Sequence, residues 1–534
     1  MSSVELLVIL LVVTAALAWL AHRVRVPYPI FLTLAGLGIG VLGMRLGPNA
    51  PTVRLHPDVV FLIFLPPLLY HAGLLTSWRD FRANLRPISF LAIGLVLFTT
   101  VAVAAVAHYA IGMRWDAAFV LGAIVSPPDA IAATAITRRL RVPRRVVTIL
   151  EGESLVNDAS ALIAYRFAVA AVVAGEFSLG RAAGAFVMTA VGGVCVGYAV
   201  GRAFVWLRPR LHDPAVEGVA ALLIAYVAYL PAEWLHASGV LAAVTAGVYV
   251  GRRVPQITGS STRLRLYAVW DTLEFVLNGL VFILIGLQIP EVVRGLGGYS
   301  WPALIGYSAA VSAAAIVVRL LWVFPATYMT RLLPVIRRHD PTPAFGPVFL
   351  IAWVGLRGIV SLAAALALPT VLEDGVTPFP HRDLIVFLTF AVILATLVGQ
   401  GLTLPWVIRR LDLPADHVGE QEEELARLET TNAALARLHV LSFTGEIADD
   451  VIERARVPYE QRLQYYGPRR RGIRSDGGDA ICRSDAQVAR VAIGAEREML
   501  VRLRDEGAIG DDTLRRIQTE LDLQEARLGS DEEE

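Results

Sequence analysis

The chain has 534 residues, of which 55% are hydrophobic and 18% are charged, and its mean hydropathy is +0.58. This balance excludes an ordinary soluble domain and indicates a polytopic membrane protein. Residues 1–411 contain 31 arginines and 19 acidic residues, whereas residues 412–534 contain 17 arginines and 28 acidic residues, so their formal charges are +12 and −11. We therefore predict a transmembrane domain over 1–411 and a polar tail over 412–534.

Thirteen apolar runs follow one another in the first domain. They lie near 3–22, 27–44, 58–76, 86–110, 116–137, 146–174, 182–206, 215–235, 238–251, 267–289, 301–330, 345–371 and 383–408. Because a helix needs ~20 apolar residues to cross a bilayer, the runs predict an all-α membrane protein with about 13 transmembrane helices. The first run follows no basic segment and is long enough to span, so we interpret it as a retained helix and not as a cleaved signal.

The positions of the arginines predict the orientation of the chain. If the N-terminus lies outside, the loops on the inner side hold 22 arginines and the outer loops hold six. Arginine and lysine are enriched in cytoplasmic loops, so this arrangement places the N-terminus outside and the tail in the cytoplasm.

Two of the runs contain helix breakers near their centres. Ser126-Pro-Pro-Asp-Ala130 interrupts the fifth run, and Gly355-Leu-Arg-Gly358 interrupts the twelfth. Unwound backbone at membrane depth must be buried in protein or line a wet cavity, and paired interruptions in two halves of a chain indicate a transporter's binding site. A simple proline kink is the alternative for the fifth run.

The sixth run carries the polar stretch Glu151-Gly-Glu-Ser-Leu-Val-Asn-Asp158. An ionisable side chain at membrane depth is a candidate functional group. On a helix, Ser154 and Asp158 share one face. Glu153 and Asn157 share the adjacent face, so oxygen ligands suited to a hard cation converge here. A buried polar network that joins helices is the alternative interpretation.

Asp158 is our candidate for the group that carries both the ion and the proton. Desolvation favours its protonated form and a bound cation favours the carboxylate, so one group can bind either H⁺ or a metal ion. Asn157 offers only dipoles beside it. The predicted metal ligands are Asp158, Ser154, Glu153 and Ser126, and the wider ion-binding set adds Asn157 and Asp129.

A buried arginine in the twelfth run needs an acidic partner. For Arg357, Glu153 or Glu151 is the natural choice, and we predict a structural salt bridge between Arg357 and Glu153 that leaves Asp158 free to titrate. Asp129 is either a second ligand or a cap on the half-helix that begins at the first break.

Other polar residues of the spans receive a structural interpretation. Arg319 and Arg166 can each pair with an acid that the sequence does not identify. We interpret Glu274 as a structural polar contact and His71 as a solvated or satisfied imidazole near a helix end.

An enzyme must also be considered. Gly152-Glu-Ser-Leu-Val156 begins like a nucleophile elbow but lacks the second glycine and the preceding strand. The sequence contains neither a P-loop nor a His-Glu-x-x-His zinc motif, so we expect secondary transport without a cofactor. An intramembrane hydrolase that uses Ser154 is the alternative from another class.

The tail differs from the rest of the chain in composition. Charged helical patterns cover about 421–443, 485–507 and 511–528, and a basic, glycine-rich linker surrounds 467–478. We predict a small helical cytoplasmic appendage that is regulatory or supports oligomers. A solvated tail without a specific partner is the alternative.

Several motifs of the first domain resemble the cation/proton antiporter family that includes bacterial and animal sodium/proton exchangers. They are Phe64-Leu-Pro-Pro-Leu-Leu-Tyr70, Ser126-Pro-Pro-Asp-Ala-Ile131, Glu151-Gly-Glu-Ser-Leu-Val-Asn-Asp158, Leu273-Glu-Phe-Val-Leu-Asn-Gly-Leu-Val-Phe282 and Gly355-Leu-Arg-Gly-Ile-Val-Ser-Leu362. The similarity covers about 1–411 and does not include the tail.

The resemblance implies a homodimer of inverted-repeat subunits. Its mobile core corresponds to about 86–175 and 300–410, and its dimerisation part to about 1–76 and 182–289. The ion-binding aspartate of the family falls on Asp158. The neighbouring asparagine, supporting glutamate and serine, and core arginine fall on Asn157, Glu153, Ser154 and Arg357.

The first break departs from the family pattern. The family's Thr-Asp-Pro falls on Pro128-Asp129-Ala130, so the aspartate is present but the threonine is a proline without a side-chain oxygen. Whether Ser126 replaces that oxygen is left open. The Asn-Asp pair resembles that of the electroneutral branch.

We therefore predict an antiporter that exchanges Na⁺, with Li⁺ or K⁺ as alternative cations, for H⁺ across a bacterial plasma membrane by alternating access. Its expected partners are a monovalent cation, the proton, membrane lipid and a second copy of the chain, and no nucleic acid. A K⁺/H⁺ exchanger is the alternative within transport.

Overall fold

The structure is a computed structural model, and it describes residues 3–45, 55–129, 133–134, 142–174, 179–211, 213–332, 334–372, 376–411, 413, 418–444, 447–466 and 483–530. Within these ranges the regular elements are helices, apart from one isolated bridge between Val371 and Pro378. The predicted all-α class is therefore confirmed.

Helices of the transmembrane domain follow the predicted runs closely. They are α1 (Ser3–Val24), α2 (Tyr28–Arg45), α3 (Leu65–Leu75), α4 (Trp78–Ala83), α5 (Leu85–Ser89), α6 (Val96–Val106), α7 (Trp115–Val125), α9 (Arg144–Ala174), α10 (Leu179–Leu207), α11 (Pro214–Trp234), α12 (Gly239–Ile257), α13 (Ser260–Leu287), α14 (Ile289–Arg294), α15 (Trp301–Tyr328), α16 (Pro334–His339), α17 (Phe345–Trp353), α18 (Ile359–Leu366), α19 (Arg382–Leu394) and α20 (Gly401–Arg410). Short π-helical segments join α5 to α6 and α19 to α20.

Nine helical stretches of the described chain are long and apolar enough to cross a membrane. Two further apolar helices, Val59–Leu75 and Trp115–Val125, are shorter. The remaining predicted runs contain α12 and the pair α17 and α18. Each run thus contains a helix, and the number of about 13 crossings stays a prediction.

Both predicted interruptions are present. Helix α7 ends at Val125, just before two prolines that lack the amide hydrogen a helix needs. Helix α17 ends at Trp353, and α18 begins only at Ile359. The residues between them include Gly355, where a Cβ would lie 2.8 Å from Arg357 Nη1 and 2.9 Å from Arg319 Cδ. The second break therefore makes room for two arginine side chains.

Two apolar cores hold the transmembrane domain together. The first joins α7, α15, α17, α18 and α19 with parts of α2 and α13. The second joins α3, α11 and α12. Helix α9 contributes Ile149 and Leu150 to the first core and Leu155 and Ala159 to the second. The polar stretch on α9 therefore lies between two packing units, a common location for a ligand site.

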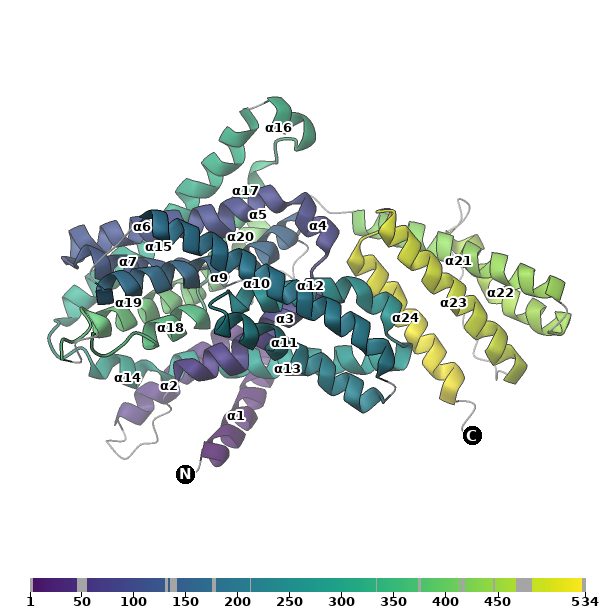
Figure 1. Cartoon of the computed structure of the whole chain (residues 1–534), viewed down its shortest axis with the longest axis horizontal. Coiled ribbons are helices and arrows are strands. Elements are labelled where there is room, and N and C mark those ends of the chain that lie inside the picture. The colour runs from purple at the N-terminus through teal and green to yellow at the C-terminus, as the bar shows by residue number, and fades with distance from the viewer. Residues whose placement is uncertain are drawn as a thin grey trace.

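Four helices form the tail: α21 (Val418–Thr444), α22 (Asp449–Tyr466), α23 (Arg483–Asp505) and α24 (Asp511–Ser530). Figure 1 shows them side by side at one end of the molecule, next to α4 and α12. Three were predicted, and α22 was missed because it is rich in charge and contains Pro458. A stripe of Val451, Ile452 and Tyr459 buries its apolar face.

The tail packs on the arginine-rich end of the transmembrane domain. Arg79, Arg144 and Arg263, all predicted to lie on the inner side, form ion pairs with tail carboxylates. The tail is thus docked on the transmembrane domain, and its role as a regulatory or oligomer-supporting appendage stays a prediction.

Candidate ion-binding site

The polar stretch on α9 presents two faces to different surroundings. Asp158 and Ser154 line a cavity, whereas Glu153 and Asn157 do not. Asp158 is 8% exposed, and Glu153 and Asn157 are 1% and 0% exposed. The predicted shared face of Ser154 and Asp158 is therefore correct. The adjacent face points into protein and does not add ligands to the cavity.

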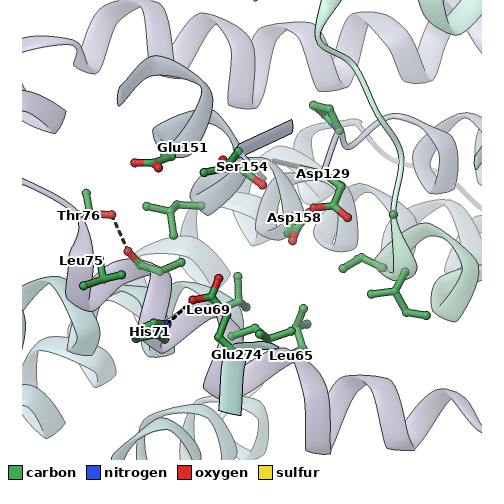
Figure 2. A pocket seen from close by; sticks show the side chains of 18 of the residues that line it. Leu65, Leu69, His71, Leu75, Thr76, Asp129, Glu151, Ser154, Asp158 and Glu274 are labelled. Atoms are coloured by element: carbon green, nitrogen blue, oxygen red, sulfur yellow. Dashed lines mark hydrogen bonds and ion pairs between the residues drawn. The ribbon is translucent and has the colours of Figure 1, made fainter. Parts of the chain in front are cut away.

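This cavity has a volume of about 730 Å³. Its polar lining comprises Asp129, Asp158, Ser154, Glu151, Glu274, His71, Thr76, Thr134, Thr148, Ser361, Arg144, Asp512 and Arg515. Asp129 and Asp158 lie next to each other, with Ser154 and Glu151 further along α9 (Figure 2). Since α9 begins at Arg144 and rises ~1.5 Å per residue, Asp158 lies ~21 Å from that end of the helix. The cavity therefore leads from the tail deep into the transmembrane domain.

Asp129 joins the two interrupted helices. Its backbone amide donates to the carbonyl of Leu356 at 2.6 Å. Its carboxylate packs against Gly358, where a Cβ would overlap Asp129 Oδ2, so only glycine permits this approach. Gly358 precedes α18, whose positive N-terminal end favours a carboxylate. The half-helix that follows the first break lies outside the described residues, so the predicted cap on it stays a prediction.

Arg357 caps the first break and does not pair with Glu153. Its Nε donates to the carbonyl of Val125, the last residue of α7, at 3.0 Å, and its Nη1 donates to the carbonyl of Gly355. Its backbone amide donates to Thr396 Oγ1 at 3.1 Å. A cation at the C-terminal end of a helix is stabilised by the partial negative charge there.

Glu153 instead pairs with Arg319 of α15. Nη1 and Nη2 of Arg319 donate to the two carboxylate oxygens at 2.5 and 2.7 Å. Arg319 Nε also donates to the carbonyl of Ile351 at 3.1 Å. The predicted Arg357–Glu153 salt bridge is therefore wrong, because the side chain of Arg319 reaches the carboxylate from a neighbouring helix while Arg357 is held at the break. Both oxygens of Glu153 are engaged, so the structure gives no support to Glu153 as a metal ligand.

Ser126 and Asn157 both stabilise backbone at the first break. Ser126 Oγ donates to the carbonyl of Ala123 at 2.9 Å and does not line the cavity. The structure therefore gives no support to Ser126 as a replacement for the missing threonine oxygen. Asn157 Nδ2 donates to the carbonyl of Pro128 at 2.8 Å, and its buried Oδ1 has no hydrogen-bond partner among the described residues.

His71, Glu274 and Ser361 are among the cavity residues that the sequence did not assign to the site. His71 Nδ1 lies 3.1 Å from Glu274 Oε2, and its ring stacks on Trp270. Ser361 of α18 is 2% exposed, and within the part of the chain that the structure describes its hydroxyl has no hydrogen-bond partner. Ser361 stands three residues after Gly358, one turn into the second half-helix. This position next to the break could have identified it as a residue of the site.

Fold and site together define a secondary ion transporter: a helical membrane domain with two interrupted helices that meet beside the buried Asp158 and the half-buried Asp129. The sequence pattern described as sodium/hydrogen exchanger, transmembrane, matches residues 8–410. The chain belongs to this sodium/hydrogen exchanger family.

Relatives and solved structures agree with this assignment. A Mycobacterium tuberculosis protein named as an uncharacterized Na⁺/H⁺ exchanger is 36% identical over 521 residues, 95% of this chain and 93% of that protein. The sodium, potassium, lithium and rubidium/H⁺ antiporter of Bacillus subtilis is 35% identical over 415 residues, 75% of this chain and 61% of the antiporter. The structure of the sodium proton antiporter MjNhaP1 from Methanocaldococcus jannaschii at pH 8 has a TM-score of 0.58 at 18% identity, covers 76% of this chain and 98% of that one, and shares the fold.

Proposed function

We propose that this chain exchanges Na⁺ for H⁺ across the plasma membrane, with Li⁺ and K⁺ as alternative cations, and that Asp158 is the proton carrier. The observation that carries the proposal is the position of Asp158 beside Asp129, in a cavity where the two interrupted helices meet. Two neighbouring carboxylates with little solvent disfavour the state in which both are charged and no ion is bound. Such a site takes up either a proton or a cation.

Exchange follows from this competition. Asp158, Asp129 and Ser154 offer oxygen atoms to a cation in the cavity. When the cation binds, the carboxylate form of Asp158 is favoured and its proton leaves; when the proton binds, the cation leaves. An empty, charged site is costly to move through apolar surroundings, so the loaded forms cross and the empty form does not.

The moving parts are a core of about 86–175 and 300–410 and a dimerisation part of about 1–76 and 182–289. Supporting this division, the second apolar core draws its buried members from the proposed dimerisation part, apart from Leu155 and Ala159 of α9. The boundary between the parts then runs along α9, beside Asp158. We further propose that the chain is a homodimer.

Orientation follows from the docking of the tail. The tail packs on the end that carries Arg79, Arg144 and Arg263, and arginine-rich ends favour the cytoplasm. We place the tail in the cytoplasm and the N-terminus outside. In that orientation the cavity of Asp158 leads toward the cytoplasm.

We expect the exchange to be electroneutral. Asn157 carries no titrating group, and both carboxylate oxygens of Glu153 accept from Arg319, so we expect one Na⁺ to replace one H⁺ at Asp158. If a second carboxylate took part, the net charge moved would gain ~2.3 kcal/mol per 100 mV of membrane potential. Asp129 is the residue that would carry it.

A broader cation selectivity is favoured by one relative. The Bacillus subtilis protein is named for sodium, potassium, lithium and rubidium, and is 35% identical.

The hydrolase alternative has weaker support. His71 shares the cavity with Ser154, but its Nδ1 lies on Glu274 and its Nε2 has no hydrogen-bond partner in the described ranges, so the structure shows no contact by which it would activate the serine hydroxyl.

The test uses purified protein in liposomes that contain a pH-sensitive dye. Na⁺, Li⁺ or K⁺ is added to separate samples. Each cation that the protein transports should change the dye signal, because protons move in exchange, and Asp158→Asn should abolish that change. Inertness with every alkali cation would contradict the proposed function. Repetition with the potential clamped by equal K⁺ and valinomycin tests stoichiometry: a reversal point that shifts with voltage would contradict one-for-one exchange.

A further inference from the structure

One end of the tail is attached to the proposed dimerisation part. Nε and Nη2 of Arg263, near the start of α13, donate to the Asp522 carboxylate of α24 at 2.7 and 2.5 Å. These two side chains are 3% and 1% exposed. Arg504 of α23 adds a hydrogen bond from Nη1 to the carbonyl of Arg252 at 2.9 Å. This attachment is buried and bidentate.

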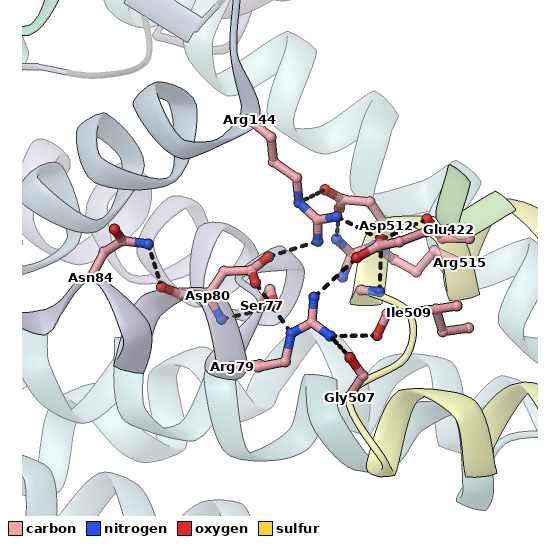
Figure 3. A network of polar contacts seen from close by, with 12 residues as sticks. Ser77, Arg79, Asp80, Asn84, Arg144, Glu422, Gly507, Ile509, Asp512 and Arg515 are labelled. Carbon is pink, nitrogen blue, oxygen red and sulfur yellow. Dashed lines mark hydrogen bonds and ion pairs between the residues drawn. The ribbon is translucent and has the colours of Figure 1, made fainter. Parts of the chain in front are cut away.

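The other attachment reaches the helix that carries the ion site. Arg144, the first residue of α9, donates from Nη1 to Glu422 Oε2 at 2.9 Å, and its Nε lies 3.7 Å from Asp512 Oδ2 (Figure 3). Arg79 Nη2 donates to Glu422 Oε1 at 3.1 Å, and the Gly510 amide donates to Glu422 Oε2 at 2.9 Å. Burial raises the pKa of Glu422, but the Gly510 amide and the two arginines outweigh it and hold that pKa below its ordinary value.

Helix α24 also reaches the ion cavity itself. Asp512 and Arg515, in its first turns, line the same cavity as Asp158. The tail therefore bonds to both parts of the transmembrane domain and covers the end of the cavity between them. The opposite net charges of the two domains, +12 and −11, favour this contact over a long range.

We propose that the tail is a strap that joins the dimerisation part to α9 and holds the transporter with the Asp158 cavity open toward the tail. This inference rests on the proposed function. Alternating access requires the core, with α9, to move relative to the dimerisation part, with α13. The tail cannot move with the core and with the dimerisation part at the same time, so one of its two attachments must open in each transport cycle.

The attachment at Arg144 is the one that opens. Arg144 is 21% exposed, and its tail partners Glu422 and Asp512 are 9% and 63% exposed, whereas Arg263 and Asp522 are only 3% and 1% exposed. Partly exposed ion pairs are weak, and separating a buried pair leaves uncompensated charges. The contacts of Glu422 and Asp512 with Arg144 therefore set how readily the core leaves the inward-open position.

The first test weakens this attachment in the full chain. Glu422→Gln together with Asp512→Asn removes the two tail carboxylates that face Arg144, retains the shape of the side chains, and leaves the pair of Arg144 with Asp80 in place. Asp450→Asn is the matched control, because it removes a tail charge whose pair in the described part of the chain is with Arg454 of the same helix. We expect Na⁺-driven proton flux in liposomes to rise about two- to tenfold in the double variant, as the loss of weak ion pairs predicts, and not in the control. Flux equal to or below that of the wild type, in protein that elutes as a single folded species, would overturn the proposal.

The second test locks the same attachment. In a background with Cys195→Ser and Cys482→Ser, Arg144→Cys and Asp512→Cys are joined by a reducible bismaleimide. Cross-linking should stop exchange and reduction should restore it. A cross-linked protein that exchanges ions at its uncross-linked rate would overturn the strap. If instead the unmodified wild type exchanges no cation, the proposed function fails, and the two failures are distinct.

Discussion

Arg319 and Glu153 form a bidentate ion pair with N–O distances of 2.5 and 2.7 Å, and both side chains are only 1% exposed. The pair joins α15 to the centre of α9, one residue before Ser154. It fixes the rotation of α9, and so directs Ser154 and Asp158 into the cavity. Glu153, which the sequence predicts both as a ligand and as a salt-bridge partner, thus acts as the anchor of the helix that holds Ser154 and Asp158.

Loss of one partner of this pair should destabilise the protein strongly. We expect Arg319→Ala to cost ~3–5 kcal/mol, because it leaves the charge of Glu153 buried and uncompensated. Thermal unfolding of detergent-purified protein measures the change, and Glu153→Gln in the same chain should recover much of it. As a control, Arg166→Ala breaks a pair with Glu233 whose arginine is 50% exposed, and should cost ~0–1 kcal/mol. Equal losses in the two arginine variants would contradict the anchoring role.

Arg357→Ala should behave differently from Arg319→Ala. Removal of the Arg357 side chain deprives the carbonyl of Val125 of a charged donor, so we expect the free energy of unfolding to fall by ~1–3 kcal/mol. Because Arg357 does not bond to Glu153, adding Glu153→Gln should bring no recovery. Recovery of stability in that double variant would restore the salt bridge expected from the sequence and contradict the structure.

Two serines near the site give a matched test of the ligand set. Ser154 lines the cavity, whereas Ser126 donates to the carbonyl of Ala123 and faces away. We expect Ser154→Ala to raise the Na⁺ concentration for half-maximal exchange by about three- to tenfold, the effect of losing one neutral ligand. Ser126→Ala should keep that concentration within about twofold of the wild-type value, since no cavity oxygen is lost. The measurement is proton flux against Na⁺ concentration in liposomes, and the opposite ranking would reject this division.

The packing of the tail should weaken as the pH rises. Glu496 is 2% exposed, and burial raises its pKa to about 7, against the lowering effects of Arg462 and Tyr459. The folded tail then holds a proton that the unfolded chain releases near its ordinary value of 4.5, so stability is greatest below about pH 4.5 and falls up to about pH 7, by ~3 kcal/mol in total.

Hydrogen exchange of the full chain tests this pH dependence. Amides of α22 and α23, corrected for intrinsic rates, should be less protected at about pH 8 than at about pH 6 in the wild type. Glu496→Gln should remove the difference. Glu498→Gln, on the exposed side of the same helix, should retain it. Identical protection of the wild type at both values would show that the burial of Glu496 does not control the tail.

Much of the architecture was predictable because it depends on local properties of the chain. Apolar runs indicate the spans, and the prolines after Ser126 and the glycines around Arg357 mark the breaks wherever the chain folds. The face shared by Ser154 and Asp158 follows from helical periodicity alone. The choice of Asp158 as the central residue needs only the rarity of acids at membrane depth.

The partners of these residues depended on the tertiary structure. Glu153 and Arg319 are 166 positions apart, and Arg144 and Glu422 are 278 positions apart, so only the packing of distant helices brings them together. The sequence shows that Glu153 needs a positively charged partner, because a buried charge must be compensated. It does not show which of several arginines is that partner. Reach and direction of each side chain decide among them, and these are properties of the assembled fold.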